Sequence, residues 1–216
     1  MTTQVTFAFI THWNNDIRAA RKPMEYALKM GFQMGDVNNA ISNLIALDQN
    51  SLLSGHHDLG ELEGLMRESV AKIRSCGQES YVAEHSITWQ VVLNLLGRAE
   101  DPLVLTGEAM NQEQAIEKAK VTDHKLVPAA IASFGGLLGY LYENPDFAVS
   151  SMKVVKKEDC IGYVIMPRHF SFLALAYVAK ALSPRADRNS SVGFVENVTA
   201  NGGRCTRLTQ QGCGRC

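Results

Sequence analysis

The stretch MGDVNNAIS, residues 34–42, contains a pattern that returns in NQEQAIEKA, residues 111–119, and in NPDFAVSSM, residues 144–152. In each stretch an Asp or Asn is followed four positions later by Ala and then by a β-branched residue. Such an Asp or Asn is typical of a helix N-cap, where its side chain accepts a backbone N–H from the first turn. The small Ala would let the preceding helix pack tightly against that turn. The pattern therefore predicts pairs of packed helices.

The spacing of the three stretches is close to that of a helix-pair repeat. The expected N-caps Asp36, Asn111 and Asn144 are separated by 75 and 33 residues, near two units and one unit of a repeat of roughly 34 to 40 residues. Patterns this short also arise by chance in helical proteins. The spacing thus favours a repeat without defining one by itself.

Further positions predict where helices begin and end. Asp58 and Glu61 have the spacing of a capping box, and Pro145 follows Asn144 at the position where proline is best tolerated. Since glycine is typical of helix ends, we expect preceding helices to stop at Gly31, Gly55, Gly77 and Gly97.

Apolar residues recur every three or four positions through most of the chain, which indicates helices. Only GYVIM, residues 162–166, has the character of an extended segment. We predict an all-α fold, an α-solenoid of antiparallel helix pairs. The expected helices span residues 14–31, 36–54, 58–76, 80–97, 111–121, 125–143, 145–158 and 167–183.

Composition divides the chain into three parts: an N-terminal extension, residues 1–11, a helical repeat domain, residues 12–184, and a tail, residues 185–216. The tail holds five Arg against one Asp and one Glu, with five Gly, three Cys and few large apolar side chains. This composition does not support a hydrophobic core, so we expect the tail to be disordered.

Charge and targeting features narrow the class of protein. The formal net charge of −1 gives no basic footprint for nucleic acid. The N-terminal residues MTTQVTFAFITHW have no basic region before their apolar patch, unlike a secretory signal. Cys76 and Cys160 are typical of thiols in a reducing compartment. We therefore expect a cytoplasmic protein that does not bind nucleic acid.

One uncharged stretch has nearly the length of a membrane span. Residues 126–142, LVPAAIASFGGLLGYLY, include Gly135 and Gly139 at the GxxxG spacing of close helix contacts. Pro128 shortens the uninterrupted apolar run, and no aromatic belt with basic flanks accompanies it. We therefore expect a helix buried inside the protein, and membrane anchoring through this stretch is the less favoured alternative.

The tail cysteines Cys205, Cys213 and Cys216 offer one C-x-x-C pair but no histidine within the tail. A closed zinc site would need a ligand from elsewhere, and a redox motif would need a βαβ context that is not indicated. His56 and His57 precede Asp58 without metalloprotease spacing, so Asp58 is interpreted as a cap beside exposed histidines.

No motif indicates catalysis. Glu84 and His85 could form an acid and a base, but no nucleophile accompanies them; we expect one of them to face solvent. Neither LTGEAM nor GGLLG has the sequence of a phosphate-binding loop. We predict no catalytic residue, no metal ligand and no cofactor site.

Residues 35–97 resemble the tetratricopeptide-like helical region of large multidomain signalling proteins. Their sequence is GDVNNAISNLIALDQNSLLSGHHDLGELEGLMRESVAKIRSCGQESYVAEHSITWQVVLNLLG. These are AAA-type ATPases that also carry protein kinase and histidine kinase domains. The likeness continues through DPLVLTGEAM, LLGYLYENPDFAV and GYVIMPRHFSFLALAYVAKAL, and covers roughly residues 12–182. It implies a tetratricopeptide-like α-solenoid without the family's ATPase or kinase motifs, so no active-site residue is carried over.

We therefore expect a non-catalytic helical-repeat module that mediates protein–protein contact in signal transduction, with an ATPase or kinase domain as the expected partner. The alternative is a helical ligand-binding protein or enzyme with a pocket between helices. The nominal pocket residues for that alternative are His85, Trp89 and Tyr142. The sequence leaves open the partner, the oligomeric state and whether the chain is a piece of a longer protein.

Overall fold

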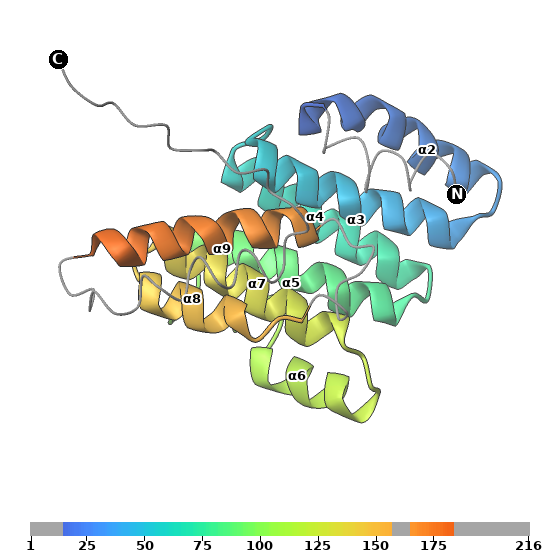
Figure 1. The fold of residues 1–216 in the computed structure, drawn as a ribbon. Helices are drawn as coiled ribbons and strands as arrows, with labels where there is room; N and C mark the ends of the chain where they lie inside the picture. Colours follow the sequence, from blue (N-terminus) through green and yellow to red (C-terminus); the bar gives the residue numbers. More distant parts are fainter. Residues whose placement is uncertain (1–14, 157–164, 184–216) are drawn as a thin grey trace, which may run out of the picture.

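The computed structural model describes residues 15–156 and 165–183, and these residues form helices with no strand among them (Figure 1). This confirms the all-α prediction, and most helices lie close to their predicted bounds. The elements are η3 (Ile17–Ala20), α2 (Arg21–Gln33), α3 (Val37–Ser54), α4 (Leu59–Ser75), α5 (Glu79–Leu95), α6 (Gln112–Val121), α7 (Leu126–Leu141), α8 (Pro145–Lys153) and α9 (Ile165–Leu182).

All four predicted N-caps are confirmed. In each case the Asp or Asn side chain accepts a hydrogen bond from the backbone N–H three residues further on, which satisfies a donor that the helix itself leaves free. The pairs are Asp36 with Asn39 at 3.4 Å, Asp58 with Glu61 at 2.8 Å, Asn111 with Gln114 at 3.0 Å and Asn144 with Phe147 at 3.1 Å.

The predicted helix ends are correct at Gly55, Gly77 and Gly97, which have φ angles of 60°, 69° and 71°. The prediction for Gly31 is wrong, because this residue lies inside α2 and the chain turns at Gly35, with φ of 75°. Glycine is needed at position 31 for another reason: an added Cβ would lie 2.9 Å from the Cβ of Ala40.

The close contact predicted from Ala in the opening pattern occurs in two of the three stretches. Gly31 meets Ala40 between α2 and α3, and Gly139 meets Ala148 in the same way between α7 and α8. Both helix pairs share a turn in which the N-cap backbone N–H donates to the glycine carbonyl oxygen at 2.8 Å. The third stretch differs, because a loop rather than a helix precedes α6.

Helices α3, α5 and α7 contribute most of the buried residues. They contact one another in succession, and α7 also contacts α9. Helices α2, α4 and α6 pack against α3, α5 and α7, respectively, and α8 packs against both α7 and α9 (Figure 1). Helix α6 packs mainly on α7, and it projects from the rest of the described chain.

Helix α7 covers nearly all of the uncharged stretch 126–142 and is buried along most of its length, as expected. Its glycines allow α8 to pack closely against it, because a Cβ added to Gly136 would lie 2.3 Å from Met152 Cγ. Within residues 15–156 and 165–183, no helix is both long enough and apolar enough to span a membrane.

Three predictions concern the ends of the described ranges. The prediction of an extended segment at residues 162–166 is wrong for Ile165 and Met166, because these residues begin α9. Residues 162–164 lie outside the described residues. Helix α8 ends at Lys153, earlier than predicted. The N-terminal extension, residues 1–11, and the tail, residues 185–216, also lie outside the described residues.

Candidate functional site

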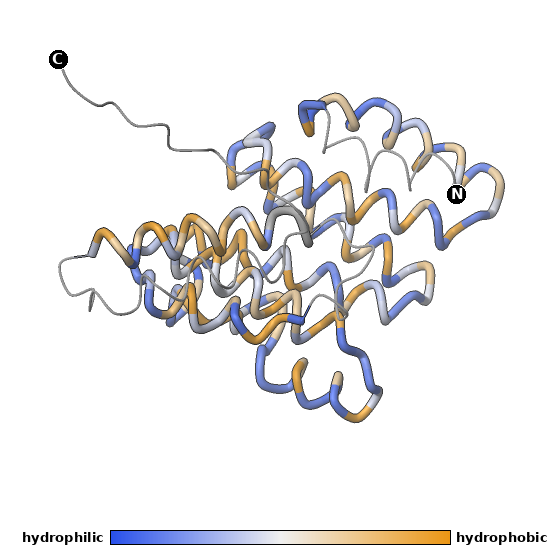
Figure 2. Tube along the Cα trace, viewed as in Figure 1, coloured by the Kyte–Doolittle hydropathy of each residue, from blue (hydrophilic) through white to orange (hydrophobic). Residues whose placement is uncertain are grey.

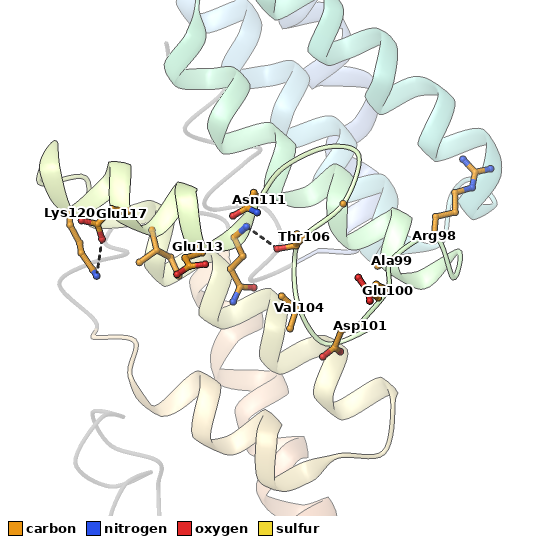
Figure 3. Close-up of a pocket in the computed structure, with 13 residues that line it drawn as sticks. Arg98, Ala99, Glu100, Asp101, Val104, Thr106, Asn111, Glu113, Glu117 and Lys120 are labelled. Atoms are coloured by element: carbon orange, nitrogen blue, oxygen red, sulfur yellow. Dashed lines mark hydrogen bonds and ion pairs between the residues drawn. The ribbon is translucent and has the colours of Figure 1, made fainter.

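An open groove of about 790 Å³ lies between α6 and the loop that precedes it, residues 96–111 (Figure 3). We call it the loop groove. Val104 and Ile116 supply apolar surface, and Figure 2 shows that α6 is mostly hydrophilic. Its size is within the range of ligand sites, about 300 to 1,000 Å³. The charged side chains that line it are Arg98, Glu100, Asp101, Glu113, Glu117 and Lys120.

Two fully buried amides of α5 hold the loop in place. Asn94 Nδ2 donates to the carbonyl oxygens of Val104 at 2.8 Å and Pro102 at 3.1 Å. Gln90 Nε2 donates to Asn94 Oδ1 at 2.8 Å, while Gln90 Oε1 accepts from the Ala109 N–H at 3.0 Å. Because the two amides lie four residues apart on one helix face, they can bind each other and the loop together.

The loop also joins itself to α6. The Leu105 N–H donates to Gln112 Oε1 at 2.9 Å, and the Gln112 N–H donates to Thr106 Oγ1 at 3.1 Å (Figure 3). The Leu105 side chain is fully buried in the core between α5 and α7. The side of the groove formed by the loop is therefore fixed by its own backbone and side-chain bonds.

A second network ties the loop to α4. Glu63 is buried, and its Oε1 accepts from Trp89 Nε1 at 3.1 Å and from Arg67 Nη2 at 2.8 Å. Arg67 Nη1 also donates to Glu108 Oε1 of the loop at 2.6 Å, and Arg98 Nη1 lies 3.5 Å from Glu63 Oε2. Burial raises the pKa of Glu63, but the bonds from Trp89 and Arg67 and the charges of both arginines lower it below its ordinary value overall. Glu63 is thus held as a carboxylate.

The loop groove carries negative charge that its own cations do not balance. Lys120 pairs with Glu117 at 3.3 Å (Figure 3), and Arg98 is directed toward Glu63 outside the groove. Among the described residues, no Lys, Arg or His forms an ion pair with the remaining three acids, Glu100, Asp101 and Glu113. A cationic ligand would therefore be attracted to this surface.

The described lining of the loop groove is mainly charged and polar. Its described lining includes no Ser, Cys or His, and the Thr106 hydroxyl already accepts a hydrogen bond from Gln112. Nucleophilic catalysis would need a nucleophile with an adjacent base. The arrangement is chemically suited to binding.

The nominal pocket residues His85, Trp89 and Tyr142 each contact a different partner. Trp89 binds Glu63, and the Tyr142 hydroxyl donates to the Asn94 carbonyl oxygen at 2.9 Å. His85 is fully buried, with its Nε2 2.9 Å from Asp48 Oδ2. These two atoms are not aligned as a hydrogen bond, and neither His85 ring nitrogen has a hydrogen-bond partner among the described residues.

Glu84 and His85 differ in exposure. His85 is fully buried, whereas Glu84 is partly exposed. Burial raises the pKa of Glu84, and the neighbouring His85 opposes this shift. The two side chains therefore occupy different environments.

Asp58 is a cap, as predicted, but the two neighbouring histidines are not equivalent. His56 is exposed, while His57 is partly buried, 3.3 Å from Arg21 and 3.4 Å from Glu61. Throughout the part of the chain that the structure describes, no group of three or more His, Cys, Asp or Glu side chains is placed to hold a metal ion. Cys205, Cys213 and Cys216 lie outside the described residues.

A buried Ser–His pair was not predicted. Ser133 Oγ lies 2.8 Å from His169 Nδ1 between α7 and α9, and it also donates to the Ala129 carbonyl oxygen at 2.8 Å. Burial lowers the pKa of His169 from 6.5 to about 4, so the ring is neutral at pH 7. The adjoining cavity is about 10 Å³ and includes no carboxylate in its lining among the described residues. It has room for about one water molecule.

The fold and the loop groove together define an all-helical protein with a polar surface groove. Comparisons of the chain with protein-family models, with curated proteins and with solved structures found no match. The candidate site is therefore defined by its own geometry and charge.

Proposed function

We propose that this protein is a non-catalytic, tetratricopeptide-like helical-repeat module that mediates protein–protein contact in signal transduction. In this proposal the helix pairs form a cytoplasmic α-solenoid, and the loop groove receives a cationic segment of a protein partner. The successive contacts of α3, α5, α7 and α9, with a second helix packed on each, support the solenoid.

The observation that carries the proposed binding role is the unbalanced charge of the loop groove. Glu100, Asp101 and Glu113 lie on a surface whose backbone is fixed by Asn94 and Gln90. A surface that is already ordered loses little conformational freedom when a partner binds. Lys and Arg side chains of an extended segment are the groups that these carboxylates would recognise.

The proposed partner follows from the resemblance of residues 12–182 to a helical region of multidomain signalling proteins. In such proteins an ATPase or kinase domain is present on the same chain, so an ATPase or kinase domain is the partner we propose. The role we propose is one of contact, and the described lining of the loop groove, which includes no Ser, Cys or His, is compatible with it.

A titration with a defined basic probe tests this proposal. The probe is an octapeptide of alternating Arg and Ala, and its affinity is measured by calorimetry at low and at physiological salt. The groove variant Glu100→Gln/Asp101→Asn/Glu113→Gln removes three charges and keeps the side chains similar in size. Its control, Glu68→Gln/Glu79→Gln/Glu143→Gln, removes three acidic charges at positions that do not line the loop groove.

We expect saturable binding that weakens with salt, because these ion pairs are exposed. Each pair contributes about 0.2 to 1 kcal/mol, so the groove variant, which lacks three charges, should lose about 3- to 150-fold in affinity. The control should bind as the original protein does. Equal affinity of the groove variant and the control would contradict a role for the loop groove.

The alternative function, a ligand-binding protein or enzyme with a pocket between helices, has one observation in its favour. Ser133 and His169 form a buried pair beside a cavity. That cavity of about 10 Å³ accommodates about one water molecule, so a substrate could enter only after α7 and α9 separate. The loop groove is the better candidate.

A further inference from the structure

The chain itself contains a segment whose charge is opposite to that of the loop groove. Residues 185–216 hold five arginines against one Asp and one Glu, which gives 5 − 2, or a net charge of +3. These arginines are Arg185, Arg188, Arg204, Arg207 and Arg215. No lysine is present in the segment, so each of its side-chain cations is a guanidinium, the group that pairs best with carboxylates through two parallel hydrogen bonds.

The segment is joined to the helical domain, so its local concentration is high. The 33 residues after Ser183 can span at most about 110 Å when fully extended. A domain of about 160 residues has a radius of gyration of about 15 Å, so this length reaches any part of its surface. Tethering of this kind gives effective concentrations of about 1 mM.

The loop groove is a part of the described surface that fits such a segment. Its three acids without an ion pair, Glu100, Asp101 and Glu113, equal the net charge of the segment in number and are opposite to it in sign. The smaller groove of about 290 Å³ between α2 and α4 is less suitable, because three acids and two cations line it, a net charge of −1. Four acids and two cations line the loop groove, a net charge of −2.

We infer that residues 185–216 occupy the loop groove of their own chain and compete with the cationic segment of a protein partner. This inference rests on the proposed function, since it assigns a regulator to the same groove. A tethered segment with an intrinsic Kd of about 0.1 to 1 mM would weaken partner binding about two- to tenfold at an effective concentration of about 1 mM. Removing these arginines or neutralising their charge would therefore leave the loop groove free for the partner.

The test compares four proteins, each with all 216 residues, in the titration with the Arg/Ala octapeptide. They are the original protein, a tail variant with all five arginines changed to Gln, the groove variant, and the combination of the tail and groove variants. We expect the tail variant to bind the probe about two- to tenfold more tightly than the original protein. This gain should disappear in the combined variant, because the groove charges are then missing.

The outcomes separate this inference from the proposed function. If the tail variant and the original protein bind the probe equally, while the groove variant binds more weakly than both, the competition is overturned and the binding role remains. If the groove variant binds as well as its Glu68→Gln/Glu79→Gln/Glu143→Gln control, the groove is not the site and both fail.

A second readout locates the segment directly. A nitroxide is placed on Cys205 in the 216-residue protein, with the other cysteines changed to serine. It should broaden the amide resonances of α6 more than those of α2. The groove variant should lose this broadening, and dilution should leave it unchanged because the contact lies within one chain. Equal relaxation of α2 and α6 would overturn the inference. The cysteines replaced are Cys76, Cys160, Cys213 and Cys216.

Discussion

Gly139 of α7 and Ala148 of α8 are in direct contact: a Cβ atom added to Gly139 would lie 3.1 Å from the Ala148 Cα. Gly31 and Ala40 stand in the same relation between α2 and α3, with the same nine-residue separation. In both pairs the N-cap residue lies between the glycine and the alanine in the sequence, and its backbone N–H donates to the carbonyl oxygen of the glycine. Close packing and helix capping are thus combined in one turn.

Gly139→Ala should destabilise the protein by about 1 to 3 kcal/mol, because the new methyl group would overlap the backbone of α8. Gly64→Ala is the matched control, since nothing lies within 4 Å of a Cβ at that helical position. There alanine should stabilise the helix by about 0.5 to 1 kcal/mol. Urea denaturation followed by circular dichroism measures both changes, and a stabilising Gly139→Ala would contradict the packing described.

Asn94→Ala should cost about 2 to 4 kcal/mol, because it removes the amide that binds the carbonyl oxygens of the loop and leaves them unpaired. Amide hydrogen exchange should accelerate across residues 98–111. Asn38 is exposed on α3, and Asn38→Ala should change stability by less than about 0.5 kcal/mol. If exchange in the loop were unaffected by Asn94→Ala, the anchoring role would be wrong.

His169 should make the protein less stable in mild acid. Its pKa is lowered from 6.5 to about 4 by burial, so the unfolded chain binds a proton that the folded chain does not. Stability should therefore fall as the pH drops from about 6.5 to about 4, by at most about 3 kcal/mol. His169→Asn removes the titrating group, so the difference in unfolding free energy between the two proteins should change across this range. A difference that is independent of pH would rule out a buried neutral His169.

His85→Leu should destabilise the protein by about 3 to 5 kcal/mol, because the buried Asp48 carboxylate would lose its neighbouring imidazole. The double variant Asp48→Leu/His85→Leu should regain most of this loss, since an apolar pair leaves no buried charge. Denaturation of both single variants and the double variant gives the coupling energy. Strictly additive effects would show that the two side chains do not interact.

Local features of the fold were predictable from the sequence, because they depend on residues close together in the chain. Asp58 and Asn144 cap helices through bonds to residues three positions away, and Gly55, Gly77 and Gly97 supply the left-handed turns. Gly31 was assigned wrongly because its role depends on a partner in the next helix. Sequence alone does not distinguish a glycine that ends a helix from one that admits a neighbour.

The loop groove was not predictable in this way. Glu100, Asp101 and Glu113 are ordinary surface acids in the sequence, and only the projection of α6 and the course of the loop bring them together. One signal was present: Gln90 and Asn94 interrupt the apolar run ITWQVVLNLLG at helical spacing. Polar residues on an otherwise buried helix indicate a polar partner, although not which one.

The central claim is that the loop groove binds a cationic protein segment, and amide chemical-shift mapping tests it most directly. The uniformly labelled 216-residue protein is titrated with the Arg/Ala octapeptide, and the shifts are followed to saturation. Saturable shifts should concentrate in residues 98–107 and in α6 and be absent from the groove variant. Shifts that do not saturate, or that lie mainly on α2 and α4, would contradict the claim.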